Sequence, residues 1–192
     1  SGPNARTVRI DLEPFTLVGA TTRLGNISTP MRDRFGAIFR LDFYQKDEIF
    51  KILKRTASIL EMNVQDDALT EIAGRSRGTP RIANRVLKRV RDFAQVKNVK
   101  EISLEDARSS LDSIGIDENG LENMDRKILK NLIVNYNGGP TGGKSLAISI
   151  NEDIQTIEDV YEPYLIKEGF IERTSRGRIA TDKAYALFDL KK

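Results

Sequence analysis

The sequence predicts a mainly α-helical fold with a small β component, and three observations support this. Apolar residues recur at helical spacing over most of residues 45–136. Strand-like stretches are few and short: an apolar run at residues 15–20 and two pieces around Ser175-Arg176-Gly177. The chain of 192 residues is long enough for one or two domains, each with its own core.

The composition excludes several kinds of active site. The chain has no cysteine and no histidine, so cysteine nucleophiles, thiolate or imidazole metal sites and Ser-His-Asp relays cannot be built within it. No stretch approaches the roughly 20 apolar residues of a membrane span, and a cytoplasmic protein is the default expectation. The net charge of +3 is mild, but residues 79–97 carry six basic residues against one acid. Such a run usually marks a solvated helix face.

Residues 15–20 predict a buried strand of a parallel sheet, because the apolar run is short and lies between Pro14 and polar threonines. A strand of that kind needs neighbouring strands and covering helices, which residues 1–42 cannot supply. We therefore expect residues 1–42 to be the end of a larger α/β domain whose earlier part lies outside this chain.

Residues 43–117 predict a compact unit of four helices. The first two show apolar faces at helical spacing. The third has Thr79 as N-cap and Pro80 at its first position. The fourth begins at Ser103 with Asp106 three residues later, a variant of the capping box. The polar turn at residues 115–120 is typical of a domain boundary.

Residues 118–192 predict a second small domain. An amphipathic helix ends near Asn137 and a short apolar segment follows; Thr156 can then cap a third helix that stops at Gly169. The two strand-like pieces around Ser175-Arg176-Gly177 are a hairpin signal. Three helices followed by a basic hairpin is the order of a winged helix.

The stretch GGPTGGKS at residues 138–145 fits the phosphate-loop pattern G-x-x-x-x-G-K-[ST]. A phosphate loop leaves a strand and opens a helix, whereas here a helix precedes Gly138. Pro140 would also remove a backbone donor from the cradle. We interpret the stretch as a turn between two helices, with Lys144 facing solvent.

Three separated stretches, in the right order, resemble the RuvB family, the AAA-plus motors that drive Holliday-junction branch migration. They are GATTRLGNISTPMRDRFG at 19–36, RSRGTPRIANRVLKRVRDFAQVK at 75–97 and TIEDVYEPYLIKEGFIERTSRGR at 156–178. The resemblance runs from residue 2 to Phe188 and covers only the later part of such a protein. It implies the end of an AAA-plus α/β ATPase core at 1–42, a four-helix AAA-plus lid at 43–117 and a winged helix at 118–192. The phosphate loop and the Mg²⁺ ligands would lie upstream of residue 1.

The resemblance implies two catalytic residues. Thr22, at the end of the apolar run, matches the first sensor, which orients the attacking water or touches the γ-phosphate of ATP. Arg34, in PMRDRF, matches the arginine finger that reaches into the neighbouring subunit's nucleotide site, a task that suits a permanently charged, forked guanidinium. The residues alone leave other interpretations open: Thr22 can cap a strand, and Arg34 can pair with Asp33 or Asp42.

The resemblance also implies cofactor-binding residues in the lid. Arg81, in GTPRIAN, matches the second sensor, which contacts the γ-phosphate, and Tyr44 and Pro80 match residues that line the adenine. A cation in the first turn of a helix opposes the helix dipole, and an anionic ligand there would remove the conflict. Apolar packing at a domain joint is the alternative account of Tyr44 and Pro80.

The expected DNA contact is the hairpin rather than the third helix. That helix carries Glu158, Asp159, Glu162 and Glu168 against Lys167, and phosphates repel such a surface. The hairpin carries Arg173, Arg176 and Arg178 with Glu172 as its acid. Basic side chains there suit contacts to the DNA backbone, which are independent of sequence and sensitive to salt. A solvated edge that prevents strand pairing is the alternative.

The predicted function is therefore that of an ATP-dependent DNA motor for recombination, repair and the SOS response in the bacterial cytoplasm. It would act as a homo-hexamer on four-way junctions and duplex arms, with ATP or ADP and Mg²⁺, a RuvA-like junction-binding protein and a RuvC-like resolvase. This chain alone is expected to lack ATPase activity, because the phosphate loop is not in it. The alternatives are a winged-helix transcriptional regulator, against which the acidic third helix speaks, and a clamp-loader-type ATPase subunit, which would not explain the hairpin.

Overall fold

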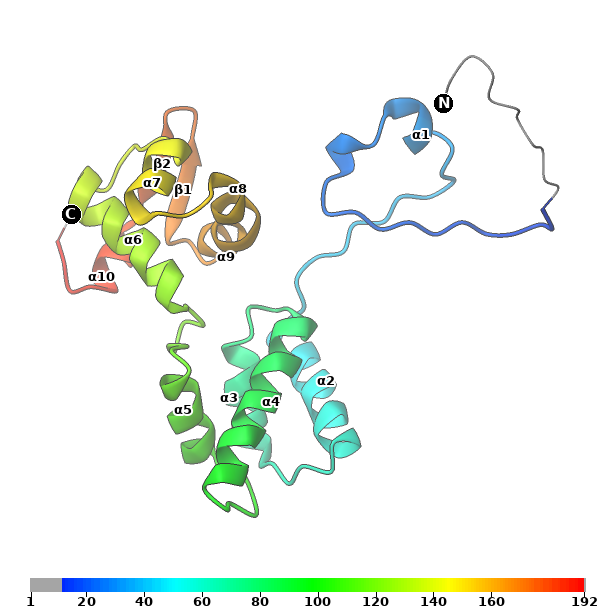
Figure 1. Ribbon diagram of the computed structural model, residues 1–192, viewed down its shortest axis with the longest axis vertical. Coiled ribbons are helices and arrows are strands. Elements are labelled where there is room, and N and C mark those ends of the chain that lie inside the picture. The colour runs from blue at the N-terminus through cyan, green and yellow to red at the C-terminus, as the bar shows by residue number, and fades with distance from the viewer. Residues whose placement is uncertain (1–11, 192) are drawn as a thin grey trace. The chain divides into compact units, whose positions relative to one another are not determined.

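The computed structural model describes residues 12–191, and the chain divides into two units between Leu41 and Asp42 (Figure 1). In the first unit, the described residues form a 3₁₀ turn, η1 (Leu24–Asn26), and one helical turn, α1 (Thr29–Arg32). The strand predicted at residues 15–20 is not formed, and Phe15 and Val18 are 69% and 86% exposed. Residues 12–41 contain no second strand with which its backbone groups could pair.

The second unit begins with four helices, as predicted: α2 (Lys46–Ile59), α3 (Asp66–Gly74), α4 (Pro80–Val96) and α5 (Leu104–Ser113). Their apolar faces meet in one core, which includes Ile49, Leu53, Leu69, Ile72, Leu87, Val90 and Leu111. Pro80 opens α4, and the predicted capping box between Ser103 and Asp106 is formed at the start of α5. Sequence periodicity and caps thus located this bundle correctly.

A winged helix follows. Its elements are α6 (Asn123–Tyr136), α7 (Gly143–Ile150), α8 (Ile154–Thr156), the π-helical turn η2 (Ile157–Tyr161), α9 (Glu162–Lys167), the strands β1 (Ile171–Thr174) and β2 (Gly177–Ala180), and α10 (Asp182–Ala186). Side chains from its helices and hairpin share a second core, which includes Leu121, Ile128, Leu132, Leu146, Leu165 and Phe170.

The third helical segment of this domain differs in detail from its prediction. Asp153, not Thr156, caps it, because the Asp153 carboxylate accepts the amides of Gln155 and Thr156. The segment then runs from α8 through η2 into α9 without leaving the helical region of backbone angles. The short helix α10 was not predicted.

The hairpin pairs β1 and β2 antiparallel, with Ile171 opposite Ala180 and Arg173 opposite Arg178. Residue Thr141, in the turn between α6 and α7, forms an isolated antiparallel bridge to Arg178. None of the helices among residues 12–191 is long and apolar enough to cross a membrane.

Candidate nucleotide-facing and DNA-facing residues

Residues 138–142 of the glycine-rich stretch lie in the turn between α6 and α7, as predicted, and residues 143–145 form the start of α7. Amides of the turn are used inside the protein: Gly138 donates to the Leu132 carbonyl and Gly139 to the Tyr136 carbonyl, each at 2.9 Å. The Thr141 amide donates to the Arg178 carbonyl at 3.0 Å. Lys144 is exposed on α7. Three backbone donors of this turn are therefore already occupied by protein carbonyls.

The lid residues predicted to face a nucleotide lie at the start of α4. Pro80 is the first residue of that helix, and Arg81 follows it with an exposed side chain. Tyr44 joins them because its amide donates to the Gly78 carbonyl at 2.9 Å, and its side chain is 45% exposed. Gly78 itself has φ +65, and a Cβ there would lie 2.6 Å from the Tyr44 carbonyl oxygen. The fold thus gathers Tyr44, Pro80 and Arg81 at one end of the lid.

Thr22 and Arg34 both belong to the first unit, and both are exposed. Thr22 follows the irregular segment that was expected to be a strand, and Arg34 lies in the turn after α1. The alternative pairing of Arg34 with Asp33 does not occur within residues 12–41. The arginine-finger role therefore stays a prediction, and the guanidinium is not engaged by that neighbour.

A buried polar joint, which the sequence did not reveal, links the four-helix bundle to the winged helix. Arg77 precedes α4 in a left-handed conformation, with φ +57, and its side chain is 7% exposed. Its guanidinium forms an ion pair with Asp125 of α6, and its Nε donates to the Gly120 carbonyl at 2.9 Å. It also lies 4.7 Å from the ring centroid of Tyr164 in α9.

The electrostatics of this joint follow from its burial. Desolvation raises the pKa of the fully buried Asp125 carboxyl, and the Arg77 charge offsets only part of that effect. Burial, with a contribution from Glu168, raises the pKa of Tyr164 to about 12. Its hydroxyl therefore remains a donor, and it bonds to the Asn119 carbonyl at 2.7 Å.

Arg75, at the end of α3, binds the segment that connects the four-helix bundle to the winged helix. Its Nη1 donates to the Ile116 carbonyl at 3.0 Å and to Asp112 at 3.1 Å, and its Nη2 bonds to Glu71 at 2.7 Å. Burial alone would raise the pKa of Glu71, but the hydrogen bonds and charges of Arg75 and Arg108 lower it. The start of the linker to the winged helix is thereby fixed to α3.

The three hairpin arginines predicted to bind DNA occupy different environments. Arg178 is 7% exposed, and its guanidinium is bonded to the buried Glu162 and, at 2.6 Å, to Glu158. The hydrogen bond to Glu162 raises the pKa of Arg178 further. Arg178 therefore has an internal role in this fold, and its predicted contact with DNA stays a prediction.

Arg173 and Arg176 remain accessible. Arg173 is 56% exposed, with longer contacts of 3.4 Å to Glu158 and 3.8 Å to Glu162. Arg176 lies in the exposed turn of the hairpin. Because Glu158 and Glu162 are occupied by arginines of the hairpin, the third helix is less acidic at its surface than its sequence suggested.

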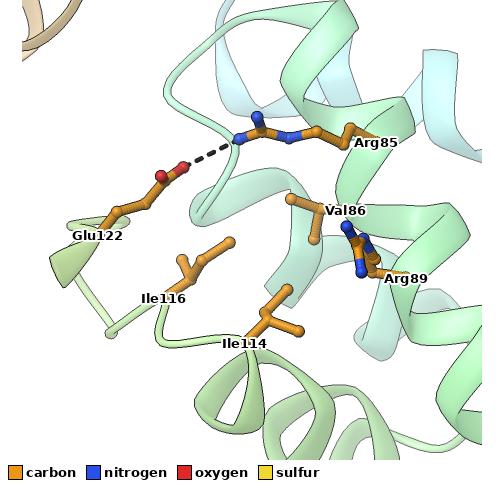
Figure 2. Close-up of a pocket in the computed structure, with 6 residues that line it drawn as sticks. All are labelled: Arg85, Val86, Arg89, Ile114, Ile116 and Glu122. Atoms are coloured by element: carbon orange, nitrogen blue, oxygen red, sulfur yellow. Dashed lines mark hydrogen bonds and ion pairs between the residues drawn. The ribbon is translucent and has the colours of Figure 1, made fainter. Parts of the chain in front are cut away.

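A pocket of about 350 Å³ lies where α4 faces the start of the winged helix (Figure 2). Val86, Ile114 and Ile116 form apolar parts of its lining, and Arg85, Arg89 and Glu122 add charge. Arg85 bonds to Glu122 at 2.9 Å across it. This contact is a second polar link between the bundle and the winged helix.

Residues 42–191 thus form a four-helix bundle and a winged helix that are linked by a buried polar joint. Three family models match this chain in succession: the Holliday junction DNA helicase RuvB P-loop domain at residues 1–41, the RuvB AAA lid domain at 44–117 and the RuvB C-terminal winged helix domain at 118–189. The chain belongs to the RuvB family.

Similar proteins agree with this. The chain is 57% identical over 189 residues to the Holliday junction branch migration complex subunit RuvB of Oleidesulfovibrio alaskensis, covering 98% of this chain and 59% of that protein. It is 55% identical to the Salinibacter ruber subunit of the same name, covering 98% of this chain and 55% of that one. The structure of the Thermotoga maritima RuvB Holliday junction branch migration motor superposes with a TM-score of 0.88 at 48% identity, covering 94% of this chain and 60% of that one. The chain thus spans less than two thirds of the length of these relatives. The family matches do not favour the alternatives of a transcriptional regulator or a clamp-loader subunit.

Proposed function

We propose that this chain works within an ATP-dependent DNA motor that drives branch migration of Holliday junctions in recombination and repair. The observation that carries this proposal is the succession of three RuvB family models along residues 1–189. We divide the chain accordingly into residues 1–42 from the ATPase core, 43–117 as the lid and 118–192 as the DNA-contacting winged helix.

In this proposal ATP, with Mg²⁺, is hydrolysed at the subunit interfaces of a hexamer. Arg81 contacts the γ-phosphate from the lid, and Tyr44 and Pro80 flank the adenine; their gathering at one end of the lid supports this. Thr22 orients the attacking water, and Arg34 acts on the neighbouring subunit's nucleotide. The metal ligands and the phosphate loop are supplied by parts of the intact protein outside this chain.

DNA is held through its backbone. Arg176 at the hairpin turn and the half-exposed Arg173 supply the positive charge, a mode of binding that suits a motor moving along any sequence. The proposed partners are four-way junctions, a RuvA-like junction-binding protein and a RuvC-like resolvase. The proposed setting is the bacterial cytoplasm during repair and the SOS response.

The test is a branch-migration assay on a synthetic four-way junction, with the intact protein and its junction-binding partner. We expect ATP-dependent conversion of the junction to duplex products. No conversion, with ATP hydrolysis intact and unaffected by DNA, would contradict the proposal. This chain alone should show no Mg²⁺-dependent ATP turnover, and turnover in a sample free of contaminating ATPases would contradict that part.

A further inference from the structure

The loop between α3 and α4 has the nucleotide-facing end of the lid on one side and the winged helix on the other. Gly78 accepts a hydrogen bond from Tyr44, and Pro80 and Arg81 follow directly. One residue before Gly78, Arg77 turns its side chain into the winged helix. Within the five residues 77–81, Arg77 therefore contacts the winged helix, while Gly78, Pro80 and Arg81 belong to the end of the lid that is predicted to face the nucleotide.

The Arg77 side chain contacts three separate parts of the winged-helix domain. Its Nε donates to Gly120 in the linker, its Nη2 pairs with Asp125 at the start of α6, and its plane lies over Tyr164 in α9. Contacts to three separate elements restrict the orientation of the winged helix more than a single contact would. The forked, planar guanidinium suits this task better than an ammonium group would.

The partners of Arg77 are themselves held in place. The Asp125 oxygen that faces Arg77 also accepts the Glu122 amide at 2.7 Å, and Tyr164 is bonded through its hydroxyl to Asn119. Gly120, with φ +69, has no room for a side chain, because a Cβ would lie 2.9 Å from the Tyr164 hydroxyl and 3.1 Å from the Arg75 carbonyl. A buried ion pair contributes little net stability compared with apolar packing, but it can specify one arrangement.

A second contact also joins the winged helix to the four-helix bundle. Lys167, at the end of α9, lies 4.6 Å from the ring centroid of Phe43. Phe43 is the neighbour of Tyr44, so α9 touches the entrance of the four-helix bundle as well as Arg77. The winged helix is therefore attached to the two chain segments that border the nucleotide-facing end of the lid.

We propose that Arg77 is a positioning residue that makes the lid and the winged helix turn as one body, so that lid movement at the nucleotide reaches the DNA-facing hairpin. The rigid attachment stands on the contacts of this chain alone. Its use in converting ATP hydrolysis into DNA movement rests on the proposed function.

The attachment can be measured on this chain, which has no cysteine. Spin labels are placed at two exposed sites, Lys51→Cys on α2 and Ser175→Cys at the hairpin turn, and their distance distribution is measured by pulsed dipolar spectroscopy. We expect one narrow distance, lost in the Arg77→Met background and kept in the Arg108→Met control. Arg108 is 55% exposed and pairs within the bundle. A distribution that stays narrow in a folded Arg77→Met chain would overturn the attachment.

Two further measurements complete the test. If Arg77→Met does not fold, Arg77→Lys keeps a positive charge but lacks the fork that reaches Gly120, Asp125 and the Tyr164 ring together; broadening in that variant supports the joint, and an unchanged width counts against it. In the intact protein, Arg77→Met should retain ATP hydrolysis while losing branch migration. Parallel loss of both activities would assign Arg77 a merely structural role. Absence of both activities in the unmodified protein would instead refute the proposed function and leave the distance result standing.

Discussion

The ion pair beneath the hairpin leads to a prediction about stability. Replacing Arg178 by Met leaves the carboxylate of Glu162, whose side chain is 2% exposed, with only Arg173 at 3.8 Å. Breaking one partner of a buried pair costs about 3–5 kcal/mol. For a chain of this length, a loss of that size lowers the melting temperature by roughly 10 °C. The measurement is guanidinium chloride denaturation followed by far-ultraviolet circular dichroism.

The control is Arg176→Met, the same change at an exposed hairpin position, which should alter stability by no more than about 0.5 kcal/mol. A loss below about 1 kcal/mol for Arg178→Met, the range of a surface pair, would refute the assignment of a buried, structural ion pair. The double change Arg178→Met with Glu162→Leu removes both charges and should recover most of the lost stability. If that stabilised variant binds duplex DNA as the unmodified chain does, Arg178 makes no DNA contact; if it does not, the original sequence prediction for Arg178 is supported.

Four other outcomes are expected. Arg176→Ala should weaken duplex binding and reduce the slope of log K against log salt by about 1, whereas Arg176→Lys should keep most of that slope; an unchanged slope would exclude a phosphate contact. Arg34→Ala in the intact protein should leave ATP binding nearly unchanged and lower turnover by ~10³-fold or more, and normal turnover would remove Arg34 from the catalytic role. Hydrogen bonds from Ser103 lower the pKa of Asp106 below its ordinary value of 3.8. The stability that the Asp106 carboxylate contributes is therefore present above that pH and is lost as the pH falls through the lowered pKa. Asp106→Asn should abolish this acid dependence of stability, which denaturation at several pH values would show. Lys144→Ala should not change nucleotide binding by the intact protein in a calorimetric titration, and lost binding would reinstate the glycine stretch as a phosphate loop.

Elements with a strong local pattern could be predicted from the sequence. The helices of the bundle have apolar residues at helical spacing, and Ser103 with Asp106 is a self-contained start signal. The strand at residues 15–20 was predicted from an equally local signal, but a strand needs a partner, and residues 12–41 provide none. The difference is that a helix satisfies its own backbone and a strand does not.

The candidate site was predicted less completely, because the number of charges along a segment does not show which of its side chains are buried. Arg173 pairs directly opposite Arg178, yet Arg178 is buried and Arg173 is 56% exposed, so alternation between strand faces does not separate these two arginines. The sequence does set Arg176 apart, because it lies in the turn between the two strands. The pair of Arg77 with Asp125 is different, since the two residues are 48 positions apart and neither repeats a pattern. Only the folded chain brings them together.

The turn between α6 and α7 also explains why a nucleotide-binding signature can arise without a nucleotide. At Gly139, with φ +94, an added Cβ would collide with the Arg178 carbonyl, and at Gly143 it would lie 2.5 Å from the Arg178 guanidinium. A main chain that must approach a neighbouring strand this closely has the same steric requirement as one that must approach a phosphate: no side chain in the way. Close packing against the hairpin therefore requires glycine at two positions of the glycine-rich stretch, Gly139 and Gly143. What distinguishes this turn from a phosphate loop is that its amides at Gly138, Gly139 and Thr141 donate to carbonyl groups of the protein itself.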